Sequence, residues 1–206
     1  MPKTKSLLNG IGNQKETERY YDDWATNYDE TLKNWNYKAP KKAVDILFNL
    51  KKNIIFNLDL ACGTGLFGEE LIKKNNMIII DGCDISSQSL KITKKKNLYR
   101  NLFRQSFEKK IKLNHKYDSV SMIGSMTYCK KPNLLFPIIF NYLKKNGIFI
   151  FTHRVDLWIK QDFDSLIHSY NKLFKFNYKS RPLNYLPENI DFSNKVKIRI
   201  VGLKKI

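Results

Sequence analysis

Residues 58–71 constrain the fold of this chain more than any other stretch, because an apolar run, a glycine-rich turn and a helix start follow one another there. The apolar residues at 58–60 predict a buried strand. Gly63 and Gly65 lack a Cβ atom, so the backbone can take positive φ and a ligand can approach the main chain. The helix expected from Leu66 directs its free amide groups at the same place. The segment therefore predicts a ligand site at the end of a strand in an α/β fold.

Charge around this turn separates two kinds of ligand. Gly63, Gly65 and Gly68 match the G-x-G-x-x-G pattern of dinucleotide dehydrogenases. Asp59 lies four residues before Gly63, where it would repel a pyrophosphate and attract a cationic cofactor. S-adenosylmethionine carries an ammonium and a sulfonium and no phosphate. Asp84 ends the second apolar run, 19 residues after Gly65, a spacing that suits a carboxylate on the ribose hydroxyls of either cofactor. Asp59 thus favours S-adenosylmethionine, and an NAD-dependent dehydrogenase remains the rival.

The rest of the chain alternates apolar runs with helical patterns. We expect strands near 54–60, 77–83, 101–106, 117–123 and 147–152, and intervening helices near 66–75, 86–96 and 132–144. Residues 144–147, Lys-Lys-Asn-Gly, predict a helix end and a turn before the fifth strand. A helix near 157–173 follows, and the runs at 174–181 and 195–203 predict an antiparallel pair. Strands separated by helices imply right-handed crossovers and a parallel, doubly wound sheet.

Several short segments carry a family resemblance. Residues 59–65, Asp-Leu-Ala-Cys-Gly-Thr-Gly, followed by Gly-Cys-Asp-Ile-Ser at 82–86, resemble class I S-adenosylmethionine-dependent methyltransferases. The chain is most similar to the methyltransferase-like family of the Williams–Beuren syndrome region, through Tyr-Asp-Asp-Trp-Ala at 21–25, Tyr-Asp at 28–29, Tyr-Lys-Ala-Pro at 37–40 and Ala-Cys-Gly-Thr-Gly-Leu at 61–66. The likeness covers residues 15–154.

The resemblance implies both a fold and a cofactor. The fold is an α/β, Rossmann-like class I methyltransferase fold, with a seven-stranded, mostly parallel sheet in the order 3-2-1-4-5-7-6 flanked by helices. The cofactor is S-adenosylmethionine, bound outside the carboxyl ends of the strands. The resemblance places Asp59 near the methionyl ammonium, Asp84 on the ribose and Ile85 against the adenine. It adds three further cofactor contacts around the glycine turn and one after the fourth strand: Ala61, Gly63, Gly65 and Ile123.

The adenine edge departs from the family pattern. Class I enzymes often carry an acidic residue after the third strand, where this chain has Gln105, Ser106 and Phe107. A serine hydroxyl can hydrogen-bond the adenine amino group, and a phenylalanine ring can stack on the base. We therefore assign Ser106 and Phe107 to the adenine, with Glu108 as the alternative partner.

The N-terminal region predicts a lid. Residues 1–13 are expected to be a flexible tail, and 14–206 a single methyltransferase domain whose residues 14–51 form an N-terminal helical lid. The first lid helix, expected to end near residue 33, carries Tyr20, Trp24 and Tyr28 on one face. Aromatic faces attract a sulfonium by roughly 0.5–2 kcal/mol, so we expect these three rings to bind the cofactor. The alternative is that they form the core face of the helix.

Methyl transfer by in-line displacement needs alignment and desolvation more than a covalent intermediate. If the acceptor must lose a proton, His153 is the candidate base, because it ends the fifth predicted strand beside the expected cleft. A purely structural role for this histidine is the alternative. Tyr128, Cys129 and Tyr185 are candidates for the acceptor pocket, and core packing is equally compatible with their positions.

The charge of the chain raises nucleic acid as a partner without favouring it. The 206 residues, enough for one domain, carry a formal net charge of +18. Only six of the 37 basic residues are Arg, the side chain that best grips phosphates and bases. Abundant Lys, Asn and Ile indicate a compositional bias instead. The compact chain has no insertion large enough for an obvious macromolecule-docking module, so a small-molecule acceptor is expected, with RNA or protein methylation, or a non-catalytic S-adenosylmethionine-binding module, as alternatives.

Cysteine usage and hydropathy predict the compartment. Cys62, Cys83 and Cys129 are widely spaced and form no Cys-x-x-Cys pair, which favours reduced thiols and argues against a structural metal. The apolar runs at 77–80 and 134–140 are far shorter than the roughly 20 residues of a spanning helix. We expect a cytoplasmic protein without a membrane segment.

Overall fold

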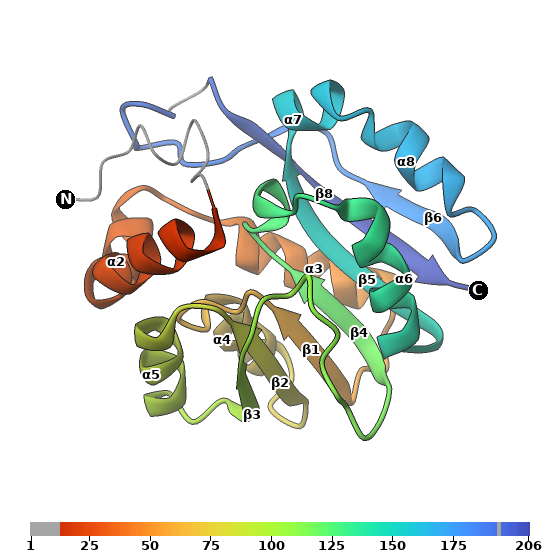
Figure 1. Cartoon of the computed structure of the whole chain (residues 1–206), viewed down its shortest axis with the longest axis horizontal. Helices are drawn as coiled ribbons and strands as arrows, with labels where there is room; N and C mark the ends of the chain where they lie inside the picture. Colours follow the sequence, from red (N-terminus) through yellow and green to blue (C-terminus); the bar gives the residue numbers. More distant parts are fainter. Residues whose placement is uncertain (1–12, 193–194) are drawn as a thin grey trace.

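The computed structural model describes residues 13–192 and 195–206, and it builds them around one mixed sheet flanked by helices (Figure 1). The strands are β1 (Phe56–Leu60), β2 (Ile79–Asp84), β3 (Tyr99–Arg104), β4 (Tyr117–Met122), β5 (Leu143–Arg154), β6 (Phe174–Lys179), β7 (Leu183–Asn184) and β8 (Lys197–Lys205). The helices are α2 (Gln14–Asn34), α3 (Ala39–Leu50), α4 (Leu66–Lys74), α5 (Ser87–Lys95), α6 (Pro132–Tyr142), α7 (Val155–Lys160) and α8 (Phe163–Ser169), with a 3₁₀ turn η1 (Met126–Tyr128).

The order of the strands confirms the predicted topology in its essentials. The sheet runs β3-β2-β1-β4-β5-β8-β6, and the short β7 pairs with β8. Strands β1 to β5 are parallel to one another, whereas β8 lies antiparallel between β5 and β6. The last strand therefore inserts where the prediction placed it. The prediction missed β7, a strand of two residues, so the sheet has eight strands rather than seven.

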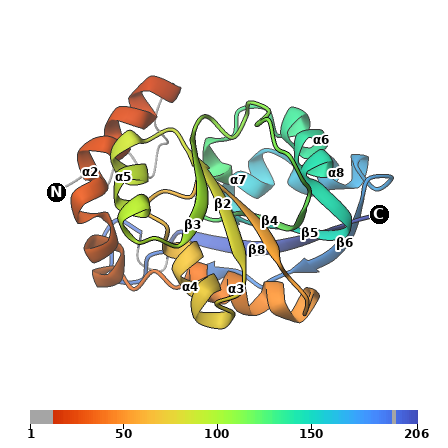
Figure 2. The same ribbon diagram turned by 90° about the horizontal axis from the view of Figure 1, so that it is seen from below.

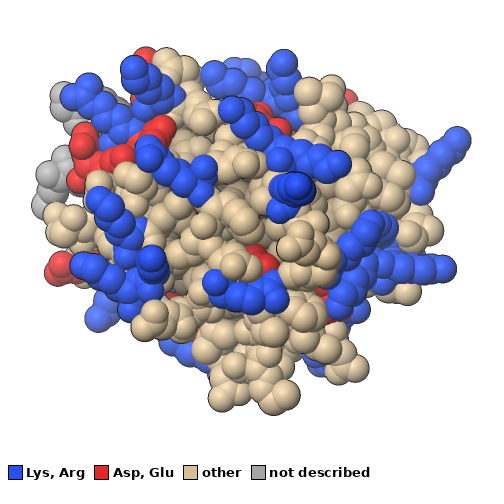
Figure 3. Space-filling model, turned by 60° about the horizontal axis from the view of Figure 1, so that its bottom comes forward, with Lys and Arg blue, Asp and Glu red and all other residues tan. Residues whose placement is uncertain are grey.

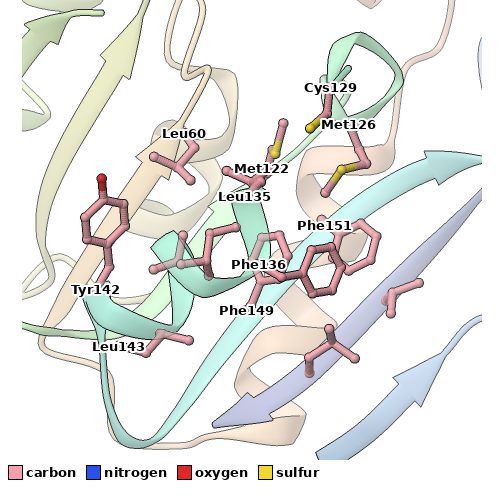
Figure 4. Close-up of a cluster of buried hydrophobic side chains, with 14 of the residues drawn as sticks. Leu60, Met122, Met126, Cys129, Leu135, Phe136, Tyr142, Leu143, Phe149 and Phe151 are labelled. Atoms are coloured by element: carbon pink, nitrogen blue, oxygen red, sulfur yellow. The ribbon is translucent and has the colours of Figure 1, made fainter. Parts of the chain in front are cut away.

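Two apolar cores cover opposite faces of the sheet. In β5, Ile148 and Ile150 join the cluster under α3 and α4, whereas Phe149 and Phe151 join the cluster under α6 and α8. Successive side chains of a strand point to opposite faces, which is why alternate residues separate in this way. Figure 2 shows α3 and α4 on one side of the sheet and α6 and α8 on the other. The larger core gathers phenylalanine rings from α6 and β5 (Figure 4).

Several boundaries differ from the prediction for local reasons. Residues 1–12 of the expected flexible tail lie outside the described residues, but Asn13 is the N-cap of α2 and forms a capping box with Glu16. The expected turn at 144–147 lies within β5, where Asn146 has φ +60°. The single helix expected near 157–173 is divided, because Asp162 takes φ +45° and caps α8.

The Lys and Arg side chains lie in separate groups over the face seen in Figure 3, rather than in one band. That distribution agrees with a compositional origin of the positive charge. Within the described part of the chain, no helix is long and apolar enough to cross a membrane. The three cysteines are buried and free.

Candidate functional site

A cavity of about 280 Å³ opens at the carboxyl ends of β1, β2 and β4, and helix α2 forms one of its walls. This edge of a parallel sheet is where α/β folds bind ligands. The lining residues come from five places along the chain: Asn13, Gln14, Thr17, Tyr21 and Tyr28; Ala61 and Gly63; Asp84, Ile85 and Ser89; Gln105, Ser106, Phe107 and Glu108; and Ile123, Gly124, Ser125, Tyr128 and Lys130.

The glycine turn after β1 presents bare backbone to this cavity. Gly63 has φ +54°, and a Cβ atom placed on it would meet nothing within 4 Å. Its N–H donates a hydrogen bond of 2.8 Å to Oδ2 of Asp84. A side chain here would be strained and would project into open space. The turn thus leaves room for a ligand that touches the main chain.

Asp84, at the end of β2, holds the turn and faces the same cavity. Its Oδ1 accepts the N–H of Ser86 at 2.8 Å, while its Oδ2 accepts that of Gly63. Burial raises the pKa of this carboxyl above its ordinary value, although the backbone N–H groups oppose the shift. A carboxylate offers about four lone-pair sites, so acceptor capacity remains for a hydroxyl-bearing ligand.

Asp59 lies deeper than the prediction assumed. Its side chain is 1% exposed and lines a second, smaller cavity of about 40 Å³, which it shares with Gly63, Thr64 and Tyr37. Its two oxygens accept hydrogen bonds of 2.7 Å from the hydroxyls of Tyr99 and Ser121. Burial raises the pKa of Asp59 to about 7. With this pKa, the Asp59 carboxyl gains or loses its proton near neutral pH.

Tyr99 explains the other glycines of the pattern and was missed by the sequence analysis. A Cβ atom on Gly68 would collide with the Tyr99 ring, and one on Gly65 would lie 3.3 Å from it. These glycines let the ring pack beneath the turn, from where its hydroxyl reaches Asp59. Gly65 itself is not among the residues lining either cavity. No sequence signal linked a tyrosine at the start of β3 to an aspartate in β1.

The remaining residues predicted to contact the cofactor fall into two groups. Those that line the larger cavity are Tyr28, Ala61, Ile85, Ser106, Phe107 and Ile123. Tyr20 and Trp24 do not line it. Trp24 is 5% exposed and packs with Leu186 and Phe192 in an apolar cluster, as expected for a residue on the core face of the helix. Helical periodicity indicated the shared face of these rings but not the neighbour that each one meets.

The adenine candidates lie together after β3. The Ser106 hydroxyl accepts the N–H of Glu108 at 3.2 Å, which fixes the loop. Glu108 is tied to the segment before α6, because its Oε1 accepts the N–H groups of Lys130 and Lys131 at 2.9 and 3.2 Å. Phe107 is partly buried against the larger core. The loop therefore brings a hydroxyl and an aromatic ring to the cavity in a fixed arrangement.

The structure does not bring His153 to the cavity. Its side chain is 1% exposed, its ring centroid lies 4.3 Å from that of Phe163, and its Nε2 lies 3.1 Å from Oε1 of Gln161. Burial lowers the pKa of this imidazole to about 4, so the ring is neutral at physiological pH. The expectation that the end of β5 faces the cleft fails at this position, because the side chain points under α7 and α8.

Polar contacts fasten α2 across the site, and no sequence pattern indicated them. Asp22 accepts hydrogen bonds from the Ser86 hydroxyl at 2.7 Å and from the N–H of Gln88 at 3.0 Å. Asp29 accepts the Thr64 hydroxyl and pairs with the Lys96 ammonium at 2.6 Å. Figures 1 and 2 show α2 and α5 side by side. Helix α2 is thereby held to the glycine turn and to both ends of α5.

Comparison with known proteins agrees with this geometry. Residues 58–149 match the family model described as "Methyltransferase domain". Methyltransferase-like protein 27 of Homo sapiens is 33% identical over 96 residues, 45% of this chain and 39% of that protein. Malonyl-[acyl-carrier protein] O-methyltransferase 2 of Ilyobacter polytropus is 28% identical over 145 residues, 68% of this chain and 54% of that protein. The chain thus spans about half the length of the curated relatives it matches.

A solved structure shares the fold over almost the whole chain. The plantazolicin methyltransferase BpumL in complex with SAH superposes with a TM-score of 0.64 at 14% identity, over 98% of this chain and 94% of that one. The chain therefore has the Rossmann-like fold of class I methyltransferases. Residues 58–149 carry the sequence signature of the methyltransferase domain.

Proposed function

We propose that this protein is an S-adenosylmethionine-dependent methyltransferase that transfers the methyl group by in-line displacement to a small-molecule acceptor. One observation carries the proposal: the bare backbone of Gly63 and the carboxyl of Asp84 meet in one cavity at the carboxyl ends of the strands. When bound, S-adenosylmethionine supplies a methyl group on a positively charged sulfur. The match to the methyltransferase domain supports the same assignment.

The residues present fit that cofactor better than a dinucleotide. Asp84 is available to ribose hydroxyls, while Ile85 and Phe107 offer apolar walls and Ser106 a hydroxyl for the adenine. Asp59, in the adjoining smaller cavity, suits the ammonium of the amino-acid end. Two carboxylates beside the glycine turn would repel a pyrophosphate. This argues against the NAD-dependent dehydrogenase that the glycine pattern alone allowed.

The chain's contribution to the reaction is to position the reactants and to exclude water. Helix α2 covers the cavity and brings Tyr28 to its lining. Closing a site in this way aligns the reactants and replaces solvent with fixed dipoles. His153 is not part of the proposal, because its ring lies against Phe163 and outside the cavity.

The size of the cavity favours a small acceptor. About 280 Å³ lies near the lower end of the range of roughly 300–1,000 Å³ for small-molecule sites, and cofactor and acceptor must share it. The relative from Ilyobacter polytropus is named for malonyl-[acyl-carrier protein], so a carrier-bound acceptor is a rival to a free small molecule. RNA methylation, protein methylation and a non-catalytic binding module are also rivals, and measurements of binding and turnover distinguish them.

We further propose that the protein is a member of the Williams–Beuren-region methyltransferase-like family and acts in the cytoplasm. The motif at 61–66 that carried the resemblance forms the glycine turn of the cavity. Buried free cysteines agree with a reducing compartment.

Calorimetric titration is the first test. We expect S-adenosylmethionine and S-adenosylhomocysteine to bind the full chain, and NADH not to bind. Preference for NADH would overturn the cofactor assignment. Gly63→Val should abolish binding while the far-ultraviolet circular dichroism stays unchanged, because the new side chain would occupy the ligand's space.

Turnover is the second test. A cell extract is incubated with the protein and methyl-labelled S-adenosylmethionine, and the labelled product is identified by mass spectrometry. Label in a small metabolite is the expected result. Label in RNA or protein would show that the acceptor is a macromolecule and not a small molecule. Cofactor binding without label would support a binding module.

A further inference from the structure

Three tyrosines line the cavity. Tyr21 and Tyr28 come from α2, and Tyr128 comes from η1 after β4. The Tyr21 ring centroid lies 6.1 Å from that of Tyr28 and 6.0 Å from that of Tyr128, with interplanar angles of 64° and 90°. The hydroxyls of Tyr21 and Tyr128 are hydrogen-bonded at 2.8 Å. We call these three side chains the phenol box.

The phenol box is uncharged. Burial raises the pKa of all three phenols above the ordinary value, those of Tyr21 and Tyr28 well above it. Neutral phenol rings attract a cation through their faces without pairing it with a counter-charge. The box therefore accepts positive charge and offers nothing to an anion except hydroxyl groups.

Ser125 adds an independent sign of a ligand. Its side chain is 7% exposed, lines the same cavity, and its buried Oγ has no hydrogen-bond partner among the described residues. Buried hydroxyls in native proteins are nearly always hydrogen-bonded. A ligand N–H or O–H beside Ser125 would satisfy this one.

The charges of the lining also favour a cationic product. The charged residues that line the cavity are Asp84, Glu108 and Lys130, two acids and one base, although the whole chain carries a net +18. Asp84 holds the glycine turn, Glu108 accepts backbone N–H groups, and Lys130 is exposed. His153, the candidate base at the end of β5, is enclosed elsewhere. An acceptor that needs a strong base to become nucleophilic is poorly served by this set.

We propose that the phenol box and Ser125 bind the nitrogen of a small amine, which is the methyl acceptor; this inference rests on the proposed function. The neutral amine gives its lone pair to the methyl carbon while the carbon–sulfur bond breaks and its electron pair stays on sulfur. The positive charge passes from sulfur to nitrogen, and an N–H proton then leaves to water. Net charge inside the box is the same before and after transfer, so uncharged rings stabilise both states.

A binding experiment tests the box without knowledge of the natural acceptor. The full chain, saturated with S-adenosylhomocysteine, is titrated with choline, with its uncharged isostere 3,3-dimethylbutan-1-ol and with the anion 3,3-dimethylbutanoate, followed by NMR. We expect choline to bind about 2- to 30-fold more tightly than the isostere, the range that a cation–π contact provides. The anion should bind most weakly.

Variants assign this preference to the box. Tyr128→Leu removes a ring and should bring the choline-to-isostere ratio close to one, whereas Tyr128→Phe keeps the ring and should keep the preference. Tyr178→Leu, on β6 outside the cavity lining, is the matched control and should behave as wild type. Because Tyr128→Phe loses only a hydroxyl, it remains informative if the leucine variant does not fold.

The labelling experiment supplies the second readout. Labelled product from the extract should be retained on a cation exchanger, and Ser125→Ala should lower the rate of labelling. Label in an ester or an ether, or equal binding of choline and its isostere to protein that binds S-adenosylhomocysteine, would overturn the amine proposal alone. Absence of S-adenosylhomocysteine binding would instead overturn the proposed function.

Discussion

The two halves of the sheet differ in the kind of side chain that they bury. Strands β1 and β2 bury three carboxyls, Asp59, Asp81 and Asp84, each held by hydrogen bonds. The middle of β5, residues 148–151, is entirely apolar and buried on both faces. A buried carboxyl without partners would be strongly destabilising, so the polar half needs its network of donors. The comparison teaches that this fold separates the apolar packing of β5 from the proposed ligand site at the ends of β1 and β2.

The largest expected effect tests the apolar half. Phe149 is fully buried, with its ring stacked on that of Phe151 at 4.8 Å. Phe149→Ala should lower the free energy of unfolding by about 3–5 kcal/mol through lost burial and a new cavity. Urea denaturation measures it, with Phe176→Ala, 44% exposed, as the control with little effect. A matching loss of S-adenosylhomocysteine affinity in the folded variant would contradict the separation of roles.

A matched pair of aspartates in β2 sharpens the comparison. Asp84→Ala should weaken S-adenosylhomocysteine binding by roughly 1.5–3 kcal/mol, or about 10- to 150-fold, because a charge-assisted contact is lost. Asp81 faces Arg100, Asn101 and Tyr117 instead of the cavity. Asp81→Ala should therefore destabilise the fold by a similar amount and leave the dissociation constant unchanged. Calorimetry measures the S-adenosylhomocysteine affinity of both variants, and urea denaturation measures their stability. Equal affinity of Asp84→Ala and wild type would mean that the ribose site is misplaced.

Asp59 adds a pH dependence to the polar half of the sheet. Its folded pKa of about 7 lies above the ordinary value, so the folded protein holds a proton on this group that the unfolded chain has released. Its contribution to stability is present below about pH 4 and is lost as pH rises to about 7, at up to about 1.4 kcal/mol per pH unit. Asp59→Asn should lack this slope, so the difference between the stability curves of wild type and variant should isolate it.

Ligand binding should respond to Asp59 with the opposite sign. A cationic cofactor prefers the ionised carboxylate, so affinity for S-adenosylmethionine should rise as pH increases through 7. Calorimetry between pH 6 and 8 measures this trend in wild type and in Asp59→Asn, which should show less of it. An identical pH profile in the two proteins would place the ammonium away from Asp59.

The smallest expected effect concerns the lid. Asp22→Ala removes the contacts of α2 with Ser86 and Gln88 and should lower stability by about 1 kcal/mol. Hydrogen exchange in α2 should accelerate, while exchange in β5 stays as in wild type. Asp23→Ala, at the exposed neighbouring position, is the control. Uniform acceleration across the sheet would show that α2 does not open separately.

Sequence reasoning was successful where function and local geometry coincide. The glycine turn and Asp84 follow from spacing and alternation, the strand order follows from the family resemblance, and the structure places Gly63 and Asp84 at one cavity. It did not identify tertiary neighbours: Trp24 lies in one apolar cluster with Phe192, and the His153 ring lies against Phe163, so neither lines the cavity. Periodicity indicates which face of an element is apolar, but not what that face meets.

By itself, the sequence determined the succession of strands and helices, the place of the glycine turn and the excess of lysine, because these depend on spacing and composition. Only the tertiary structure decided that Tyr99 in β3 hydrogen-bonds Asp59 and that Asp22 in α2 hydrogen-bonds Ser86. It also decided that Tyr21 hydrogen-bonds Tyr128, 107 positions away in the chain. Each of these contacts joins side chains that no local pattern relates. Their positions follow from how the sheet twists and how α2 crosses its edge, which is where the candidate acceptor site is formed.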